Sequence, residues 1–295
     1  MGDTVSAVSN WGRWGDADEI GALNLVDPQA VLEAVSLVQE GKVISLAQPT
    51  GPRQEVSPHR GRSARFMNRD AGDYALGARS PGGFRFAEDT VQFSTHSGTH
   101  VDALAHVWSG DQLYNGHSPA VIRTTAGAQK LGADKIPPTL TRGVFLDLAE
   151  LHGSPLPPST PIDASELIEA YQQAGIRPRA GDAVLLHTGW WASAGGTSTY
   201  FDREPGLSLD GAQWLAQQDV GLVGADNYAV EVQPDPAGDH FPVHLLLMHK
   251  NGVMLVENLN LTSLRAAKAT TFLFILAPLP LQGSTGSPVT PLAVV

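Results

Sequence analysis

The sequence predicts an α/β layered domain whose β-sheet is mostly buried. Signals for strands and helices alternate along the chain, which is typical of a sheet covered by helices. The chain has 295 residues, of which 42% are hydrophobic, so it can bury a sizeable core. The sequence shows neither a linker-like break nor an internal repeat. We therefore expect one domain over residues 1–295.

The chain opens with an irregular segment, which we expect to form an N-terminal arm over about residues 1–26. Trp11 and Trp14 lie in this segment among glycine and aspartate residues. One interpretation is that both rings fill gaps in the core. A sharper one is that they reach a substrate pocket, in this subunit or a neighbouring one, and for that role we name Trp14.

The first helix is predicted to begin after Asp27. Asp27 can cap it, Pro28 suits its first position, and Gly41 can end it. A strand is predicted over residues 42–47. The segment that follows, from Gly51 to about Glu88, reads as a long loop that holds seven of the fourteen arginines. Such a loop could form a lid over a site, and one arginine could bind a substrate carboxylate. For any single arginine, a solvated counter-charge on an acidic surface is the simpler interpretation.

The rest of the chain continues the alternation of strands and helices. Asp163 and Glu166 have the spacing of a capping box at the start of a helix. We predict strands over residues 90–94, 143–148, 183–188, 221–225 and 253–259, and helices over residues 163–175, 209–218 and 242–252.

Three histidines and a carboxylate fall within eleven residues after the strand at 90–94. They are His96, His100, Asp102 and His106. In extended chain His100 and Asp102 point to the same side, and Gly98 permits the tight backbone that would bring His96 back to the same ion. Three ligands on one segment leave positions open for water and substrate, as in a catalytic metal site. Nitrogen and oxygen donors suit Zn²⁺, Mn²⁺ or Fe²⁺.

For other ionisable residues, the sequence gives weaker evidence of a role in the metal site or the substrate pocket. Glu257 ends an apolar strand, where a carboxylate should not be buried without a partner such as a metal or a metal-bound water. His240 is a candidate for lining a substrate pocket. His187 lies on an apolar strand and is most simply a hydrogen-bonded core histidine, and we expect His249 at the surface.

The histidine segment resembles the H-x-G-T-H-x-D-x-P-x-H signature of the cyclase family, which includes bacterial kynurenine formamidases and isatin hydrolases. The matching residues are His96, Gly98, Thr99, His100, Asp102 and His106, and Leu104 stands where the signature has proline. The resemblance implies a metal-dependent amide or ester hydrolase with a swivelling β/β/α architecture, in which a mixed, buried sheet is flanked by helices.

The resemblance also implies roles for individual residues. His96, His100 and Asp102 would be metal ligands and His106 the acid/base. Further ligands would be His244 and Glu257, which align with a histidine and a glutamate that complete a second metal site in some relatives. It thus implies one or two divalent ions per chain, Zn or Mn, and a homodimer or higher homo-oligomer.

We therefore predict a hydrolase that opens the amide bond of a cyclic amide or an aryl formamide. Lactone or ester hydrolysis is the nearest alternative. His100-Val101-Asp102 is also the H-x-D of a facial-triad iron oxygenase, which would need a distant histidine such as His187 or His244. The third alternative is a non-catalytic binding protein that keeps a metal as a docking centre.

Charge and composition exclude several classes of partner and site. The net charge of −11 disfavours nucleic acids and anionic membranes, so we expect a small-molecule substrate. The chain has no cysteine and therefore no disulfide or thiolate ligand. Its start lacks the basic and apolar pattern of a secretory signal, and we expect a cytoplasmic location.

Overall fold

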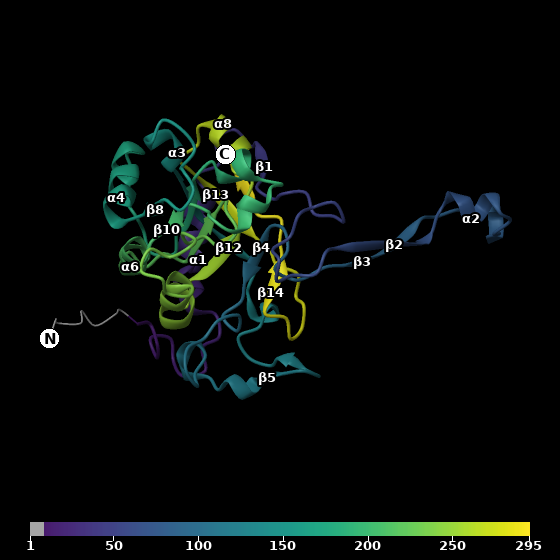
Figure 1. The fold of residues 1–295 in the computed structure, drawn as a ribbon, viewed down its shortest axis with the longest axis horizontal. Coiled ribbons are helices and arrows are strands. Elements are labelled where there is room, and N and C mark those ends of the chain that lie inside the picture. The colour runs from purple at the N-terminus through teal and green to yellow at the C-terminus, as the bar shows by residue number, and fades with distance from the viewer. Residues whose placement is uncertain (1–8) are drawn as a thin grey trace.

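The computed structural model describes residues 9–295, and its centre is one large mixed β-sheet (Figure 1). In spatial order the strands are β1 (Val43–Ser45), β15 (Leu292–Val294), β13 (Thr271–Leu276), β7 (Thr139–Asp147), β9 (Ala183–His187), β11 (Leu222–Ala225), β12 (Met254–Glu257), β4 (His100–Asp102) and β14 (Gly286–Pro288). Strands β7, β9, β11 and β12 are parallel, and the strands on either side of them are antiparallel. The predicted α/β fold with a mixed, buried sheet is confirmed.

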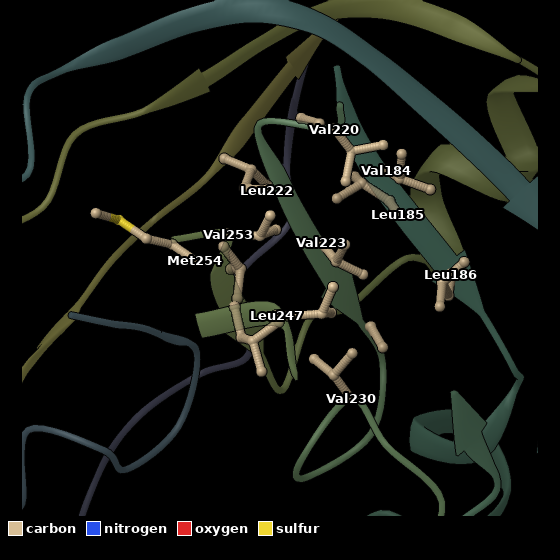
Figure 2. Packing of buried hydrophobic residues seen from close by; sticks show 14 of the residues in the cluster. Val184, Leu185, Leu186, Val220, Leu222, Val223, Val230, Leu247, Val253 and Met254 are labelled. Carbon is tan, nitrogen blue, oxygen red and sulfur yellow. The ribbon is translucent and has the colours of Figure 1, made fainter. Parts of the chain in front are cut away.

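The middle of the sheet is buried on both faces. Every residue of β9, β11 and β12 is buried, as expected for parallel strands rich in valine and leucine that are covered by helices. Figure 2 shows Val184 and Leu186 of β9 near Val223 of β11, and Leu247 packed beside Val253. This core holds the ends of β12 and β4 in place.

Helices cover the sheet. The α-helices are α1 (Pro28–Val35), α2 (Ala71–Ala75), α3 (Leu148–Leu151), α4 (Ala164–Gln173), α5 (Trp190–Ala194), α6 (Leu209–Gln217), α7 (Pro242–His244) and α8 (Thr262–Ala267), and α7 continues into a π-helix, η7 (Leu245–Lys250). The 3-10 helices are η1 (Gly21–Leu25), η2 (Pro81–Gly83), η3 (Tyr114–Gly116), η4 (Pro119–Val121), η5 (Ala133–Lys135) and η6 (Ser198–Phe201). Three two-stranded sheets pair β2 (Ala64–Arg69) with β3 (Glu88–Gln92), β5 (Ile122–Arg123) with β6 (Gly127–Ala128), and β8 (Pro161–Ile162) with β10 (Gly206–Leu207).

Local capping signals predicted where helices begin better than where they end. Asp27 caps α1 by accepting a hydrogen bond from the Ala30 amide, and the predicted capping box at the start of α4 is present. The predicted end of the first helix at Gly41 is wrong, because α1 stops at Val35. The Ser36 hydroxyl donates to the Glu33 carbonyl at 2.6 Å, and such side-chain bonds to the backbone compete with helix continuation.

The arginine-rich segment differs from its prediction. Instead of a loop up to Glu88, strands β2 and β3 form an antiparallel hairpin that carries α2 at its far end. Figure 1 shows this hairpin projecting away from the rest of the molecule, so it does not lie over its own sheet as a lid. The strand predicted over 90–94 is β3, which ends at Gln92. It belongs to the hairpin, because β3 pairs only with β2 among the described strands.

The described part of the N-terminal arm packs against the body. Trp11 and Trp14 contact the main hydrophobic core, and the Trp11 indole donates to the His249 carbonyl at 2.6 Å. This cover leaves His249 only 2% exposed, so its predicted surface position is wrong. Residues 1–8 of the expected arm lie outside the described residues. Within 9–295, no helix combines the length and apolar character needed to cross a bilayer.

Candidate metal centre

Strand β4 carries the predicted His100 and Asp102 and is the second strand from one edge of the large sheet. It lies between β12 and β14, and the register places His100 opposite Glu257 and Asp102 opposite Gly286. Just before β4, Gly98 has φ of +65°, a conformation that side chains disfavour. This turn returns His96 to Asp102, as the spacing predicted.

The first group of donors consists of His96, His100 and Asp102. His96 Nδ1 lies 2.6 Å from Asp102 Oδ1, and His100 Nε2 lies 3.4 Å from the same oxygen. His100 Nδ1 lies 2.8 Å from the Gly98 carbonyl. Because a carbonyl only accepts, Nδ1 carries the proton and Nε2 faces the carboxylates.

The second group consists of Asp102, His244 and Glu257. His244 Nε2 lies 3.8 Å from Asp102 Oδ2 and 3.3 Å from Glu257 Oε1. The two groups are joined through Asp102 and also through His100, whose Nε2 is 3.1 Å from Glu257 Oε2. In each group the candidate ligand atoms all lie within 4.8 Å of one another. The structure therefore brings together the five residues that the sequence analysis named as metal ligands.

Burial makes this cluster a good fit for a divalent cation. All five residues are buried, and His100 Nε2, Asp102 Oδ2 and Glu257 Oε2 have no hydrogen-bond partner among the described residues. Burial alone would favour a neutral ring at His100, but the neighbouring carboxylates of Asp102 and Glu257 raise its pKa to about 9. The carboxylates thus need a positive charge beside them, and a metal held by nitrogen and oxygen donors would provide it.

His106 lies at the edge of the cluster. Its ring stacks on His96 with centroids 4.0 Å apart, and its Nε2 is 4.0 Å from Asp102 Oδ2. Burial lowers the pKa of His106 to about 4, although the Asp102 charge opposes the shift. The ring is therefore neutral at pH 7 and able to accept a proton.

A hollow of about 320 Å³ opens beside His106 and His244. Its wall includes His240, together with the aromatic rings of Trp108 and Phe241. Trp108 remains 43% exposed there. The hollow thus combines a flat apolar surface with ring nitrogens that border the cluster.

A second, larger hollow of about 640 Å³ reaches His96 from another side. Its wall is formed by residues 48–57, by arginines at the base of the hairpin, and by Trp191, Tyr200, Phe201 and Tyr228. Arg60 lies over the Tyr228 ring at 5.1 Å and donates to the His96 carbonyl. Trp14 is not among the described residues that line either hollow.

His187 lies apart from the cluster. It is buried, and its Nδ1 lies 2.8 Å from Asp147 Oδ1. Its Nε2 is 3.8 Å from Asp226 Oδ2. This is the hydrogen-bonded core position that the sequence analysis expected.

Sequence reasoning missed Glu231, which positions His244. Glu231 is buried and accepts hydrogen bonds from the backbone amides of Val243 and His244, each at 3.1 Å, and its Oε1 also contacts His244 Nδ1. The carboxylate thereby turns His244 Nε2 toward Asp102 and Glu257. The sequence feature that could have identified Glu231 is its place as the one carboxylate within the apolar run 229–232.

The Glu231→Gln variant is expected to bind divalent metal about 10- to 100-fold more weakly, the range found for hydrogen-bond partners of metal-ligating histidines. The amide keeps the shape of the side chain but can present its NH₂ group to His244 and turn the ring. Metal titration of the stripped protein measures the effect. Glu169→Gln is the matched control, because Glu169 is exposed on α4. Unchanged affinity in Glu231→Gln would contradict the positioning role.

A protein-family model described as "Putative cyclase" matches residues 20–232. This span contains His96, His100, Asp102, His106 and Glu231. It ends before His244 and Glu257, so the second half of the cluster comes from outside the matched region.

Two relatives match about two thirds of the chain. Cyclase-like protein 1 of Oryza sativa subsp. japonica is 31% identical over 207 residues, which cover 68% of this chain and 61% of that protein. An isatin hydrolase of Roseibium aggregatum is 29% identical over 221 residues, which cover 71% of this chain and 75% of that protein. The chain thus spans less than two thirds of the length of the rice relative.

Solved structures share the fold over nearly the whole chain. A crystal structure described as a novel cyclase superposes with a TM-score of 0.91 at 32% identity and covers 98% of both chains. An isatin hydrolase bound to the product analogue thioisatinate gives a TM-score of 0.66 at 20% identity, over 91% of this chain and 99% of that one. The second likeness concerns the fold alone.

Proposed function

The chain belongs to the cyclase family, whose model covers residues 20–232, and on this premise we propose that it is a metal-dependent hydrolase. The proposed reaction is the opening of an amide bond by water in a cyclic amide or an aryl formamide. One observation carries the proposal: two overlapping groups of buried donors share Asp102 and present unpartnered atoms to one another. The relative named isatin hydrolase supports the reaction class.

The proposed ligands are His96, His100, Asp102, His244 and Glu257, which together would hold one or two ions of Zn or Mn. A divalent ion bound there would polarise the scissile carbonyl and lower the pKa of water from about 15.7 toward about 7. The protein fixes the positions of these ligands. The β4–β12 register holds His100 against Glu257, and Glu231 orients His244.

His106 is the proposed acid/base. Its low pKa leaves a neutral ring nitrogen beside the cluster, and it borders the smaller hollow, where a substrate would enter. A ring in that state can take the proton of the attacking water and then pass it to the leaving nitrogen. Stacking on His96 limits how far the ring can turn.

The smaller hollow supports a flat substrate. Trp108 and Phe241 form its apolar wall, and His240 adds a polar group at the same wall. Such a surface suits the ring of an aryl amide, with the amide carbon directed toward His106 and His244. His240 is the proposed substrate-binding residue. For Trp14 the substrate role stays a prediction, because its ring packs on the core.

The test combines metal analysis with a substrate panel. The purified protein is assayed for metal by elemental analysis, stripped with a chelator, and reloaded separately with Zn²⁺ and Mn²⁺. Isatin and formanilide represent the amides, dihydrocoumarin a lactone and phenyl acetate an ester. We expect turnover of an amide that chelation removes and one of the two ions restores, with one or two ions bound per chain.

Each other outcome selects a different function. Turnover of only the lactone or the ester would replace the amide proposal by ester hydrolysis. A bound metal without turnover of any of the four compounds would favour a metal-dependent binding protein. Oxygen uptake with Fe²⁺ and a 2-oxo acid would indicate an oxygenase. Failure to bind any of the ions would overturn metal-dependent hydrolysis altogether.

A further inference from the structure

The larger hollow, whose wall includes Arg60 and Tyr228, has no part in the proposed reaction. Its volume of about 640 Å³ lies within the roughly 300–1,000 Å³ of sites that bind small molecules. No described residue lines both this hollow and the smaller one beside His106. Of the five residues in the cluster, only His96 borders it. The larger hollow is therefore a second space, which a ligand can occupy without entering the proposed substrate site.

One wall of the larger hollow is a continuous row of aromatic rings. Trp191 contacts Tyr200 with ring centroids 5.8 Å apart. Phe201 contacts Tyr200 at 5.1 Å on one side and Tyr228 at 5.3 Å on the other. Each pair meets edge to face, at 78° to 89°, which is a preferred arrangement of aromatic rings. The row thus presents a firmly packed apolar surface to a flat ring.

Arg60 lies where this aromatic row approaches the metal cluster. Its guanidinium carbon is 5.1 Å from the centre of the Tyr228 ring, and one of its nitrogens donates to the His96 carbonyl. Among the described residues, the Arg60 side chain makes no other hydrogen bond and no ion pair. A guanidinium has five N–H donors in one plane. The remaining donors can therefore bind a planar carboxylate, whose geometry a guanidinium matches.

The charge of this hollow is opposite to that of the chain. Apart from His96, the ionisable side chains with acid or guanidinium groups in its wall are Arg53, Arg60, Arg65 and Glu55. Arg65 lies 4.0 Å from Asp89, and Glu55 lies 3.5 Å from Arg62. Neither Arg53 nor Arg60 has a carboxylate partner among the described residues. In a chain whose net charge is −11, such a basic hollow favours an anionic ligand.

We propose that the larger hollow binds a small aromatic carboxylate. The carboxylate lies on Arg60, with the exposed Arg53 beside it, and the ring lies against the aromatic row. Because Arg60 also donates to the His96 carbonyl, the bound anion shares its guanidinium with the segment that carries a metal ligand. The proposal concerns binding at a separate site and does not rest on the hydrolase function.

The test titrates the purified protein with benzoate and follows binding by isothermal titration calorimetry. Two related compounds separate the parts of the ligand. Benzyl alcohol keeps the aromatic ring without the charge, and cyclohexanecarboxylate keeps the charge without the aromatic ring. We expect saturable binding of benzoate at one site per chain. Both other compounds are expected to bind more weakly, benzyl alcohol by about 10-fold or more because it loses the charged hydrogen bonds.

Three variants locate the binding site. Arg60→Gln is expected to weaken benzoate binding by about 10- to 100-fold, the range for loss of a hydrogen bond to a charged group. The matched control is Arg123→Gln, which removes the same charge at an exposed residue outside both hollows. It is expected to bind benzoate as wild type does. Trp108→Ala alters the smaller hollow and is expected to leave benzoate binding unchanged.

Several results would overturn the proposal. They are absence of saturable benzoate binding, equal affinity for either related compound, unchanged binding in Arg60→Gln, and loss of binding in Trp108→Ala, which would place benzoate in the smaller hollow. Far-UV circular dichroism checks that Arg60→Gln is folded. If it is not, Arg53→Gln at the exposed edge replaces it, and wild-type affinity in that variant would likewise contradict the proposal. None of these readouts measures hydrolysis, so the result is independent of the reaction at the metal centre.

Discussion

The Asp102→Asn variant is expected to lose divalent metal and hydrolytic turnover together. Asp102 belongs to both donor groups, and its two oxygens face His96, His100 and His244. The amide keeps the volume but replaces a charged oxygen by a neutral oxygen or an NH₂ group. Loss of a hydrogen-bond partner of a metal ligand weakens metal binding by roughly 10- to 100-fold. Loss of the ligand itself should weaken it by more, and turnover should fall to background.

Elemental analysis and the amide assay, made on the same preparation, check this expectation. Asp16→Asn is the matched control, because Asp16 is exposed in the N-terminal arm, and it should keep both metal and activity. Thermal unfolding of each protein separates loss of metal from loss of fold. If Asp102→Asn retained the wild-type metal content, the assignment of Asp102 as the shared ligand would be wrong.

The His106→Ala variant is expected to keep its metal and to lose turnover by on the order of 10² to 10⁴, the range for a positioned acid/base. His106 borders the cluster, but His100, Asp102, His244 and Glu257 lie together without it. Removing the ring therefore takes away the proton acceptor and leaves these four side chains. The kcat at saturating amide, together with the metal content, measures the effect.

A histidine outside both hollows controls for the loss of an imidazole. His59 is exposed and lines neither of them among the described residues, so His59→Ala should match wild type in kcat and metal content. Normal turnover in His106→Ala would remove the acid/base role from this residue. Loss of metal in His106→Ala would instead make it a ligand, and the proposed division of roles would then be wrong.

Much of the local structure could be predicted from neighbouring residues. Asp27 and the capping box at Asp163 mark the starts of α1 and α4 because the caps bond to amides three residues away. The placement of His96, His100 and Asp102 follows from two-residue alternation in β4 and the positive φ of Gly98. Each of these features depends on a few adjacent residues and therefore appears in the sequence pattern.

Long-range contacts could not be predicted in this way. Glu257 lies 157 residues after His100, and only the pairing of β12 with β4 places the two side chains opposite each other. Family resemblance pointed to His244, but the role of Glu231 depends on how the start of α7 packs. His249 is buried because the N-terminal arm covers it.

The contrast is clearest for the arginine-rich segment. Its glycine and proline content predicted a loop, yet it forms a hairpin that leaves the body of the molecule. Composition and spacing determined the fold class, the helix starts and the histidine segment as a candidate metal site. Only the tertiary structure showed that Glu257 lies opposite His100, that Glu231 holds His244, and where the hairpin points. The reason is physical: strand register and packing are set by the whole core, whereas capping and alternation act over a few residues.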